Sequence, residues 1–423
     1  MKKVSCVKRF LVCVLLLVFI FQLSVTGACA NKSIGDDDEA LVPSTFTSKV
    51  TDGDDVSKLP VEIKAKSAVL MDVETGQVLL SYNADLRLYP ASVTKIMTML
   101  LVVEAIDSGR ISLTDRVSCT ENSAAKGGSQ IWLEVGEQMT VDELLRATVI
   151  GSANDAATLL GEHISGSEES FIALMNARAK ELGMSNTTFV NATGLDDTTD
   201  EHLTTARDIA IMSAELLRHP IITEYTTVWM DSLRGGETQL VNTNKLVRFY
   251  EGTTGLKTGT TAKAGCCVSA SAKRDNLHLV AVVMGSENSN DRFNTAKNML
   301  NWGFGNYTLY TPEIDLAPYK GVRVESGRAE RVKALLPEIK PVLIKKGDEQ
   351  GVIVSVDIAD TVTAPVLEKQ TLGTIKITLD GKVVGDYKIL SAAEVKSLTF
   401  FDGILRLFNF ISNGKTAYPF ADS

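Results

Sequence analysis

The sequence has little proline, few aromatic residues and no excess of positive charge. Its 43 Lys and Arg residues are outnumbered by 52 Asp and Glu residues, so the formal net charge is −9. Nucleic-acid-binding domains usually carry a basic surface, and this balance argues against that class of partner. Only 10 of the 423 residues are proline, while 44% are hydrophobic. The composition excludes a disordered or collagen-like chain, and the length predicts about two or three globular domains.

Several common catalytic motifs are also missing. The sequence contains no H-E-x-x-H, no C-x-x-C, no G-x-x-x-x-G-K-[ST] and no G-x-S-x-G. Their absence leaves zinc, dithiol, P-loop and nucleophile-elbow interpretations without support. Only four histidines occur, which weakens a Ser-His-Asp triad. A serine enzyme with this sequence would need a lysine as its base, and no metal or organic cofactor is implied.

The N-terminal segment has the pattern of a secretory signal peptide. Four Lys and Arg residues within the first nine positions precede an unbroken apolar run from Phe10 to Phe21. A membrane-spanning helix needs ~20 residues, so this run is too short to span. The Ala28-Cys29-Ala30 sequence predicts cleavage after Ala30, and a lipoprotein signal with Cys29 as the lipidated residue is the alternative. Cleavage removes four positive charges and no negative ones, which takes the net charge from −9 to −13.

Cleavage would also remove three of the six cysteines. The other three, Cys119, Cys266 and Cys267, are irregularly spaced, and adjacent cysteines rarely form a disulfide with each other. We expect them to be small buried hydrophobic side chains rather than a disulfide framework.

Changes of composition divide the chain into segments. An acidic stretch rich in Ser, Thr and Gly gives way to a long region of alternating strands and helices. Beyond Pro312, alternating β-branched runs such as Val352–Val356 indicate a smaller β domain. The predicted organisation is a signal peptide at 1–30, a flexible spacer at 31–60, a mixed domain at 61–312, a β-rich domain at 313–393, an amphipathic helix at 394–415 and a tail at 416–423.

Hydrophobic periodicity and turn residues predict the elements of the mixed domain. They are strands at 68–72 and 77–82, a helix at 92–108, helical structure at 140–160 with a break at 151–152, helices at 171–182, 206–217 and 293–304, and two buried strands within 253–284. A long loop at 184–204 separates two of these helices, and a loop of that length in a compact domain usually has a function.

Near the C-terminus, apolar residues occupy one half of a helical wheel. They are Leu398, Phe400, Phe401, Ile404, Leu405, Leu407, Phe408 and Ile411, while the opposite arc holds Thr399, Asp402, Arg406, Asn409 and Asn413. This arrangement predicts a helix that lies in a membrane interface, held mainly by hydrophobic burial because the polar arc has few basic residues. The alternative is a helix docked on its own domain.

A serine and a lysine three residues apart are candidates for catalysis. Ser92 and Lys95 stand at the start of a predicted helix, where positions i and i+3 share a face. The lysine amine can therefore approach the serine hydroxyl. To act as a base it must be neutral, which requires burial or a nearby cation, and Lys257 is a candidate for that cation. The Ser-x-x-Lys pattern is common, and it also occurs at Ser5 and Ser123.

The order of three short motifs makes the first one informative. Ser92-x-x-Lys95 is followed by Ser152-Ala153-Asn154 and then by Lys257-Thr258-Gly259. The same triple, in this order, occurs in penicillin-binding proteins and class A β-lactamases. Ser286-Glu287-Asn288 also fits the middle motif, but it follows the third one.

The residues around these motifs resemble the low-molecular-mass penicillin-binding proteins that are D-alanyl-D-alanine carboxypeptidases. The resemblance covers roughly residues 60–310 and rests on Pro90–Thr98, Ser152–Ala157, Asn191–Leu195, His202–Asp208 and Gly255–Thr261. It implies an α/β catalytic domain at 61–312, with a mostly antiparallel sheet flanked by helices. It also implies a protein secreted across the cytoplasmic membrane and held at its outer face, in the cell envelope.

The resemblance implies a role for each candidate residue. Ser92 would attack the penultimate D-Ala carbonyl of a peptidoglycan stem peptide and form an acyl-enzyme, and Lys95 would take its proton. Ser152 would pass a proton to the leaving amine, and Asn154 would hold the substrate amide and Lys95. The substrate-binding residues would be Lys257, Thr258, Gly259 and Thr260, with Arg292 as a further candidate. Backbone N–H groups of Ser92 and Thr260 would form the oxyanion hole, and Lys257, Thr258 and Arg292 would bind the terminal carboxylate.

Two departures from the β-lactamase pattern favour covalent inhibition by penicillin over its hydrolysis. Ala153 replaces the aspartate of the middle motif, and no E-x-x-L-N segment occurs. The alternatives are a β-lactamase or D,D-endopeptidase of the same fold, or a non-catalytic penicillin-binding wall protein.

Overall fold

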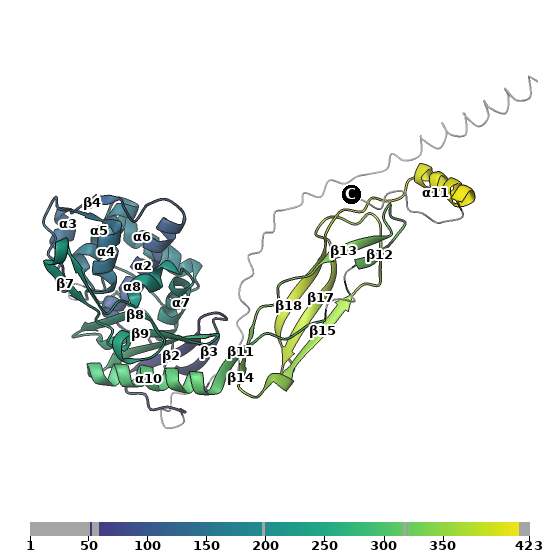
Figure 1. Ribbon diagram of the computed structural model, residues 1–423. Helices are drawn as coiled ribbons and strands as arrows, with labels where there is room; N and C mark the ends of the chain where they lie inside the picture. The colour runs from purple at the N-terminus through teal and green to yellow at the C-terminus, as the bar shows by residue number, and fades with distance from the viewer. Residues whose placement is uncertain (1–50, 53–58, 197–198, 316–318, 320, 414–423) are drawn as a thin grey trace, which may run out of the picture. The chain divides into compact units, whose positions relative to one another are not determined.

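The computed structural model describes residues 51–52, 59–196, 199–315, 319 and 321–413 (Figure 1). The predicted signal peptide at 1–30, including Cys29, and the tail at 416–423 lie outside the described residues.

A six-stranded sheet forms the centre of the larger α/β region. Its strands are β1 (Thr51–Asp52), β3 (Val78–Tyr82), β2 (Ser67–Asp72), β10 (Leu277–Ser286), β9 (Gly265–Arg274) and β8 (Thr253–Thr261), in that spatial order. Every pair is antiparallel except the parallel pair β1–β3. The predicted mostly antiparallel sheet is confirmed. The parallel strand β1 lies within the segment predicted to be a flexible spacer, so Thr51 and Asp52 are an exception to that prediction.

Helices cover both faces of this sheet (Figure 1). On one face, α2 (Lys95–Asp107) and α7 (Ala206–Leu217) share a hydrophobic core with β2 and β10. On the other face, α10 (Ser289–Asn306) packs with Leu70 and Leu279 in a second core. The remaining helices of this region are α3 (Glu121–Ala124), α4 (Val141–Val149), α5 (Asn154–Ser165), α6 (Glu168–Glu181), α8 (Ile221–Thr226) and α9 (Leu246–Phe249). Two small hairpins pair β4 (Arg116–Ser118) with β5 (Gln138–Thr140), and β6 (Met230–Leu233) with β7 (Thr238–Val241).

The chain between 253 and 286 forms three strands, not the two that were predicted. The strand that the sequence pattern missed, β9, is rich in Ser, Ala and Cys and lacks a β-branched run. It is nevertheless buried, because its serines find partners: Ser269 hydrogen-bonds Ser213 at 2.8 Å, and Ser271 accepts from Thr254 at 2.8 Å. Buried hydroxyls that are hydrogen-bonded do not carry the cost of an unpaired polar group.

Two helices begin at residues other than those that hydrophobic periodicity predicted. The predicted helix at 293–304 begins at Ser289, because Asn288 accepts from the N–H groups of Asn290 and Asp291. Arg292 therefore lies in the first turn of α10. The predicted helix at 92–108 begins at Lys95, and Ser92 lies in a preceding 3₁₀ turn, Ala91–Thr94.

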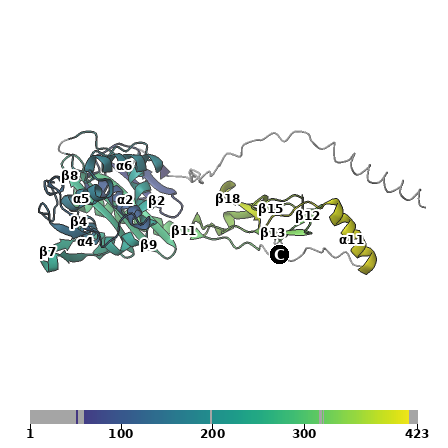
Figure 2. The same ribbon diagram turned by 90° about the horizontal axis from the view of Figure 1, so that it is seen from above.

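The C-terminal part of the described chain is β-rich, as predicted (Figures 1 and 2). Its main sheet has the strand order β15-β17-β18-β13-β12-β16. The strands are β12 (Gly321–Glu325), β13 (Arg331–Leu335), β15 (Val352–Ile358), β16 (Thr361–Thr363), β17 (Thr371–Leu379) and β18 (Lys382–Ser391). A separate pair joins β11 (Tyr307–Tyr310) to β14 (Val342–Lys345). The predicted boundary at 312–313 therefore falls between two strands that pair with each other.

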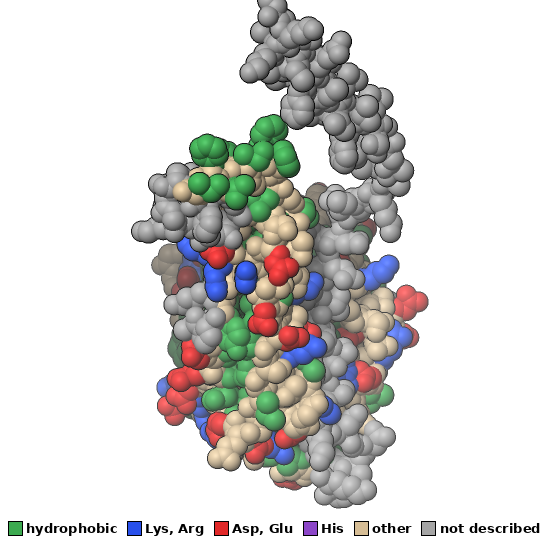
Figure 3. Space-filling model, turned by 90° about the vertical axis from the view of Figure 1, so that its right-hand side faces the viewer, with side chains coloured by type: hydrophobic (Ala, Val, Ile, Leu, Met, Phe, Trp, Pro, Cys, Tyr) green, Lys and Arg blue, Asp and Glu red, His purple; other side chains and the backbone are tan. Residues whose placement is uncertain are grey.

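The terminal helix, α11, spans Phe400–Asn413, so Leu398 and Thr399 precede it rather than belong to it. Its Asp402 is buried: the residue is 6% exposed, accepts from the backbone N–H of Thr399 and forms an ion pair with Arg328 at 3.0 Å. The large apolar side chains of α11 that the structure describes are exposed, and Figure 3 shows hydrophobic side chains gathered there. They are Phe400, Phe401, Ile404, Leu405, Leu407, Phe408 and Ile411. Within the described residues, no helix has the length and apolarity required to cross a membrane.

Candidate active site

The 3₁₀ turn that carries Ser92 is held between two glycines from distant parts of the chain. A Cβ on Gly194 would lie 1.8 Å from Ala91 O, and one on Gly259 would lie 2.9 Å from Ser92 N. Neither approach tolerates a side chain, so strand β8 and the loop around Gly194 contact this turn through bare backbone. Because α2 follows directly, Lys95 lies one turn after Ser92, as the spacing predicts.

Lys95 is fully buried and its Nζ has three polar neighbours. The Nζ lies 3.0 Å from Ser92 Oγ, 2.5 Å from Asn154 Oδ1 and 3.1 Å from the carbonyl oxygen of Thr193. Burial and, to a lesser degree, the charge of Lys257 hold the pKa of Lys95 well below its ordinary value. A neutral amine within hydrogen-bond reach of a hydroxyl is the geometry required of a general base.

The middle motif lies at the break between α4 and α5. Ser152 is 4% exposed and has a φ of 61°, a backbone conformation that is uncommon outside glycine. Asn154 begins α5, and its Nδ2 donates to Gly127 O at 2.6 Å while its Oδ1 faces Lys95. Asp155 accepts from the N–H groups of Ile131 and Leu133. Residues 152–155 therefore join the loop at 127–133 to the buried lysine.

The third motif lies on β8. Lys257 is 1% exposed, and burial, with a smaller effect from Arg292, lowers the pKa of Lys257 to about 7. Thr258 Oγ1 donates to Thr243 Oγ1 at 2.8 Å. Thr260 Oγ1 donates to Gly259 O, also at 2.8 Å. The structure thus brings the first, second and third motifs to one place, although they are far apart in the sequence.

Arg292 is 7% exposed and lies against β8. Its Nη1 donates to Gly259 O at 3.0 Å, to Thr260 Oγ1 at 2.9 Å and to Cys267 O at 3.2 Å, and its Nη2 donates to Ser289. Its Nε has no partner among the described residues. The guanidinium therefore supports the strand that carries the third motif, in addition to supplying positive charge.

The cysteines follow the prediction only in part. Cys119 and Cys267 are buried and free, and burial raises the pKa of the Cys267 thiol to about 11. Cys266 is also free but half-buried, and it pairs in register with Thr260 across β9 and β8.

Two functional groups at this site were not predicted as such. The Thr193 carbonyl faces Lys95, and His202 hydrogen-bonds Thr94. Both lie in the loop at 184–204, whose length signalled a function. A backbone carbonyl has no sequence signature of its own, so only the packing of this loop identifies it.

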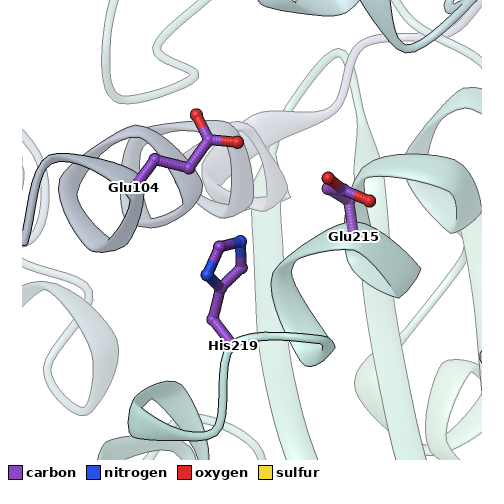
Figure 4. Close-up of side chains that lie close together, drawn as sticks. All are labelled: Glu104, Glu215 and His219. Carbon is purple, nitrogen blue, oxygen red and sulfur yellow. The ribbon is translucent and has the colours of Figure 1, made fainter. Parts of the chain in front are cut away.

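One group of three potential metal ligands occurs among the described residues: Glu104, Glu215 and His219 (Figure 4). Arg178 Nη2 lies 2.7 Å from Glu104 and 2.9 Å from Glu215, while His219 hydrogen-bonds Asp107. Both carboxylates are thus already engaged by Arg178 in an ion-pair network, and we assign no metal to these residues. The Ser123-x-x-Lys126 match is also structural, because Lys126 forms an ion pair with Glu168.

Comparison with known proteins agrees with this geometry. Residues 54–288 match the family model described as D-alanyl-D-alanine carboxypeptidase, and residues 316–397 match the model described as penicillin-binding protein 5, C-terminal domain. The chain is 41% identical to D-alanyl-D-alanine carboxypeptidase DacF from Bacillus subtilis over 370 residues, which cover 86% of this chain and 94% of the relative.

Solved structures show the same likeness. Penicillin binding protein 5 from Haemophilus influenzae superimposes with a TM-score of 0.70 at 31% identity, over 80% of this chain and 99% of that one. Penicillin-binding protein D2 from Listeria monocytogenes, in its ampicillin-bound form, has a TM-score of 0.53 at 31% identity and covers 58% of this chain and 100% of its own.

Proposed function

Because the chain belongs to the D-alanyl-D-alanine carboxypeptidase family, we propose that it removes the C-terminal D-alanine from peptidoglycan stem peptides through an acyl-enzyme on Ser92. The observation that carries the assignment of the nucleophile is the position of Lys95. Its buried Nζ lies 3.0 Å from Ser92 Oγ, and its pKa is well below the ordinary value.

Acylation begins when neutral Lys95 takes the proton of Ser92 Oγ and this oxygen attacks the carbonyl carbon of the penultimate D-Ala. The oxyanion is held by the N–H groups of Ser92 and Thr260. The missing side chain of Gly259 supports this pairing, because it lets β8 approach Ser92 N closely. The C–N bond then breaks as the proton on Lys95 passes through the hydroxyl of Ser152 to the leaving D-Ala amine, and water later hydrolyses the ester and frees Ser92.

Lys257 and Thr258, together with Arg292, bind the terminal carboxylate of the substrate in this proposal. Lys257 and Arg292 place two cationic groups near one strand, and Thr258 adds a hydroxyl. A penicillin carries both a reactive carbonyl and a carboxylate, so it enters the same site and acylates Ser92. The ampicillin-bound form of the Listeria relative supports this inference.

One experiment distinguishes the proposed carboxypeptidase activity from the alternative functions. The purified protein is incubated with labelled penicillin and, separately, with a diacyl-Lys-D-Ala-D-Ala peptide. We expect stable labelling and release of D-Ala, both abolished by Ser92→Ala. Rapid loss of the label would identify a β-lactamase, and folded protein without either activity would be a non-catalytic binding protein. Labelling that survives in Ser92→Ala would show that another residue is the nucleophile.

The proposed cellular position is the cell envelope, at the outer face of the cytoplasmic membrane. The exposed apolar side chains of α11 support attachment through this helix, because such a surface is costly in water. We further propose that 61–312 is the catalytic domain and 313–393 a separate β domain that carries the helix.

A further inference from the structure

His202 joins two segments that meet at Lys95. The histidine is fully buried in the loop that supplies the Thr193 carbonyl. Its Nε2 lies 2.9 Å from Thr94 Oγ1, one residue before Lys95. Its Nδ1 accepts from Val190 N at 3.1 Å, three residues before Thr193. The imidazole therefore links the loop to the start of α2, and both of its partners lie within three residues of the two groups that meet, Lys95 and Thr193.

The hydrogen bonds determine which nitrogen of the ring carries the proton. A backbone N–H can only donate, so Nδ1 must be unprotonated to accept from Val190. The proton of the neutral ring is then on Nε2, which donates to the Thr94 hydroxyl. Burial lowers the pKa of His202 to about 4, so this single neutral form is present at neutral pH.

The turn that presents the Thr193 carbonyl is rigid within itself. Asn191 Oδ1 accepts from the N–H groups of Thr193 and Gly194. The turn docks on α2 at two points besides His202: Ala192 O accepts from Thr98 at 2.7 Å, and Gly194 lies against Ala91. A rigid turn moves as a unit, so loss of one docking bond displaces the carbonyl that faces Lys95.

We propose that His202 is a positioning residue for acylation, whose two hydrogen bonds hold the Thr193 carbonyl on the Nζ of Lys95. This inference rests on the proposed function of Lys95 as the base. The Thr193 carbonyl accepts a hydrogen bond from the ammonium form of Lys95 and therefore stabilises this charged form. Burial and the charge of Lys257 disfavour the charged form, whereas the charge of Asp155 favours it. Losing the carbonyl therefore lowers the pKa of Lys95 further and also misplaces its Nζ relative to Ser92.

The test is the pH dependence of acylation by a labelled penicillin, measured on the purified full chain. Two variants each remove one of the two hydrogen bonds of His202 and retain the other. His202→Gln retains a donor toward Thr94, and His202→Asn retains an acceptor toward Val190. We expect both to acylate at least about tenfold more slowly at neutral pH, because positioning errors are costly to catalysis. We expect the acidic limb of the profile to move to lower pH by about one unit, since a hydrogen bond to a charged group has this effect.

His278 provides the matched control. It is also buried, its Nε2 hydrogen-bonds a threonine, Thr254, at 2.8 Å, and burial lowers its pKa to about 4, but it lies on β10 and its bond joins β10 to β8 instead of the loop at 184–204 to the start of α2. We expect His278→Gln to lower thermal stability and leave the acidic limb in place. If a His202 variant does not fold, Thr94→Val tests the same bond from its other end, with the same shift expected.

The outcomes separate this inference from the proposed function. A folded His202 or Thr94 variant whose acidic limb matches that of the wild type overturns the positioning role. A wild-type protein that penicillin does not acylate overturns the proposed function instead.

Discussion

The site contains three cationic side chains that are each at least nine-tenths buried: Lys95, Lys257 and Arg292. They form a series in which the charge of one group lowers the pKa of the next. The charge of Lys257 lowers the pKa of Lys95, and that of Arg292 lowers the pKa of Lys257. Like charges in a buried site favour the neutral form of the most strongly desolvated group. In the proposed mechanism the two ends of this series take different parts: Lys95 is neutral and acts as the base, whereas Arg292 stays charged.

The pKa of Lys257 leads to a prediction about substrate binding. Deprotonation above a pKa of about 7 removes the charge that would bind the substrate carboxylate in the proposed mechanism. We expect the KM for diacyl-Lys-D-Ala-D-Ala to rise between pH 7 and pH 9, approaching about tenfold per unit at the upper end. Lys257→Arg is the control, because its guanidinium remains charged and its KM should stay level. A wild-type KM that is constant over this range would contradict a carboxylate-binding role for Lys257.

At the scale of elements, the site is made by backbone surfaces that come unusually close. Strand β8 meets the 3₁₀ turn of Ser92 at Gly259, and the loop at 184–204 meets it at Gly194. Helix α2 then carries Lys95 into the core between them. The lysine is buried because these three elements close around it, not because of its neighbours in sequence.

Gly259→Ala is expected to separate β8 from the 3₁₀ turn that carries Ser92. The new Cβ would lie 2.8 Å from Pro90 O and 2.9 Å from Ser92 N, and neither backbone atom can move alone. We expect slower penicillin acylation and a free energy of unfolding lowered by about 1–3 kcal/mol, as for other overpacked sites. Urea unfolding and acylation rates measure the two effects. Gly305→Ala is the control, since a Cβ there has no neighbour within 4 Å. Wild-type acylation by Gly259→Ala would show that the close approach has no catalytic role.

At the scale of the whole molecule, charge and hydrophobicity are distributed unevenly. The chain has a net charge of −9, yet its site concentrates buried cations that suit an anionic substrate terminus. The apolar surface of α11 is likewise local, and Asp402 of this helix forms an ion pair with Arg328 of the β domain. The described large apolar side chains of α11 are exposed, which supports the proposed attachment to a lipid surface over docking by the apolar face.

The prediction that α11 attaches the protein to a membrane is tested by cell fractionation. We expect the signal-cleaved protein to move from the membrane to the soluble fraction when residues 399–423 are deleted, and when Phe401 and Phe408 are both replaced by Asp. Each phenylalanine contributes about 1.5–3 kcal/mol when it is buried in an apolar phase. Leu367→Asp, at an exposed leucine of the β domain, is the control and should stay at the membrane. If the truncated protein remains membrane-bound, lipidation at Cys29 or an uncleaved signal becomes the better explanation.

Local patterns were sufficient for most elements and for the chemistry. Helix α7 has the bounds that periodicity predicted, and the break between α4 and α5 falls at Ser152 as expected. Strand β9 was missed because its burial depends on serine pairs with other elements. The start of α10 was misplaced because a cap, not an apolar pattern, sets it.

The sequence by itself determined which residues are candidates for the site. The i, i+3 spacing of Ser92 and Lys95 and the order of the three motifs are local properties that survive without a fold. Only the tertiary structure decided how those residues behave. Lys95 meets Asn154 and the Thr193 carbonyl across 59 and 98 residues of chain, and its pKa falls because distant elements exclude water from it, as the proposed role of a base requires. Desolvation and hydrogen bonding depend on what surrounds a group in space, so the pKa of Lys95 and the position of His202 appear only when the chain is folded.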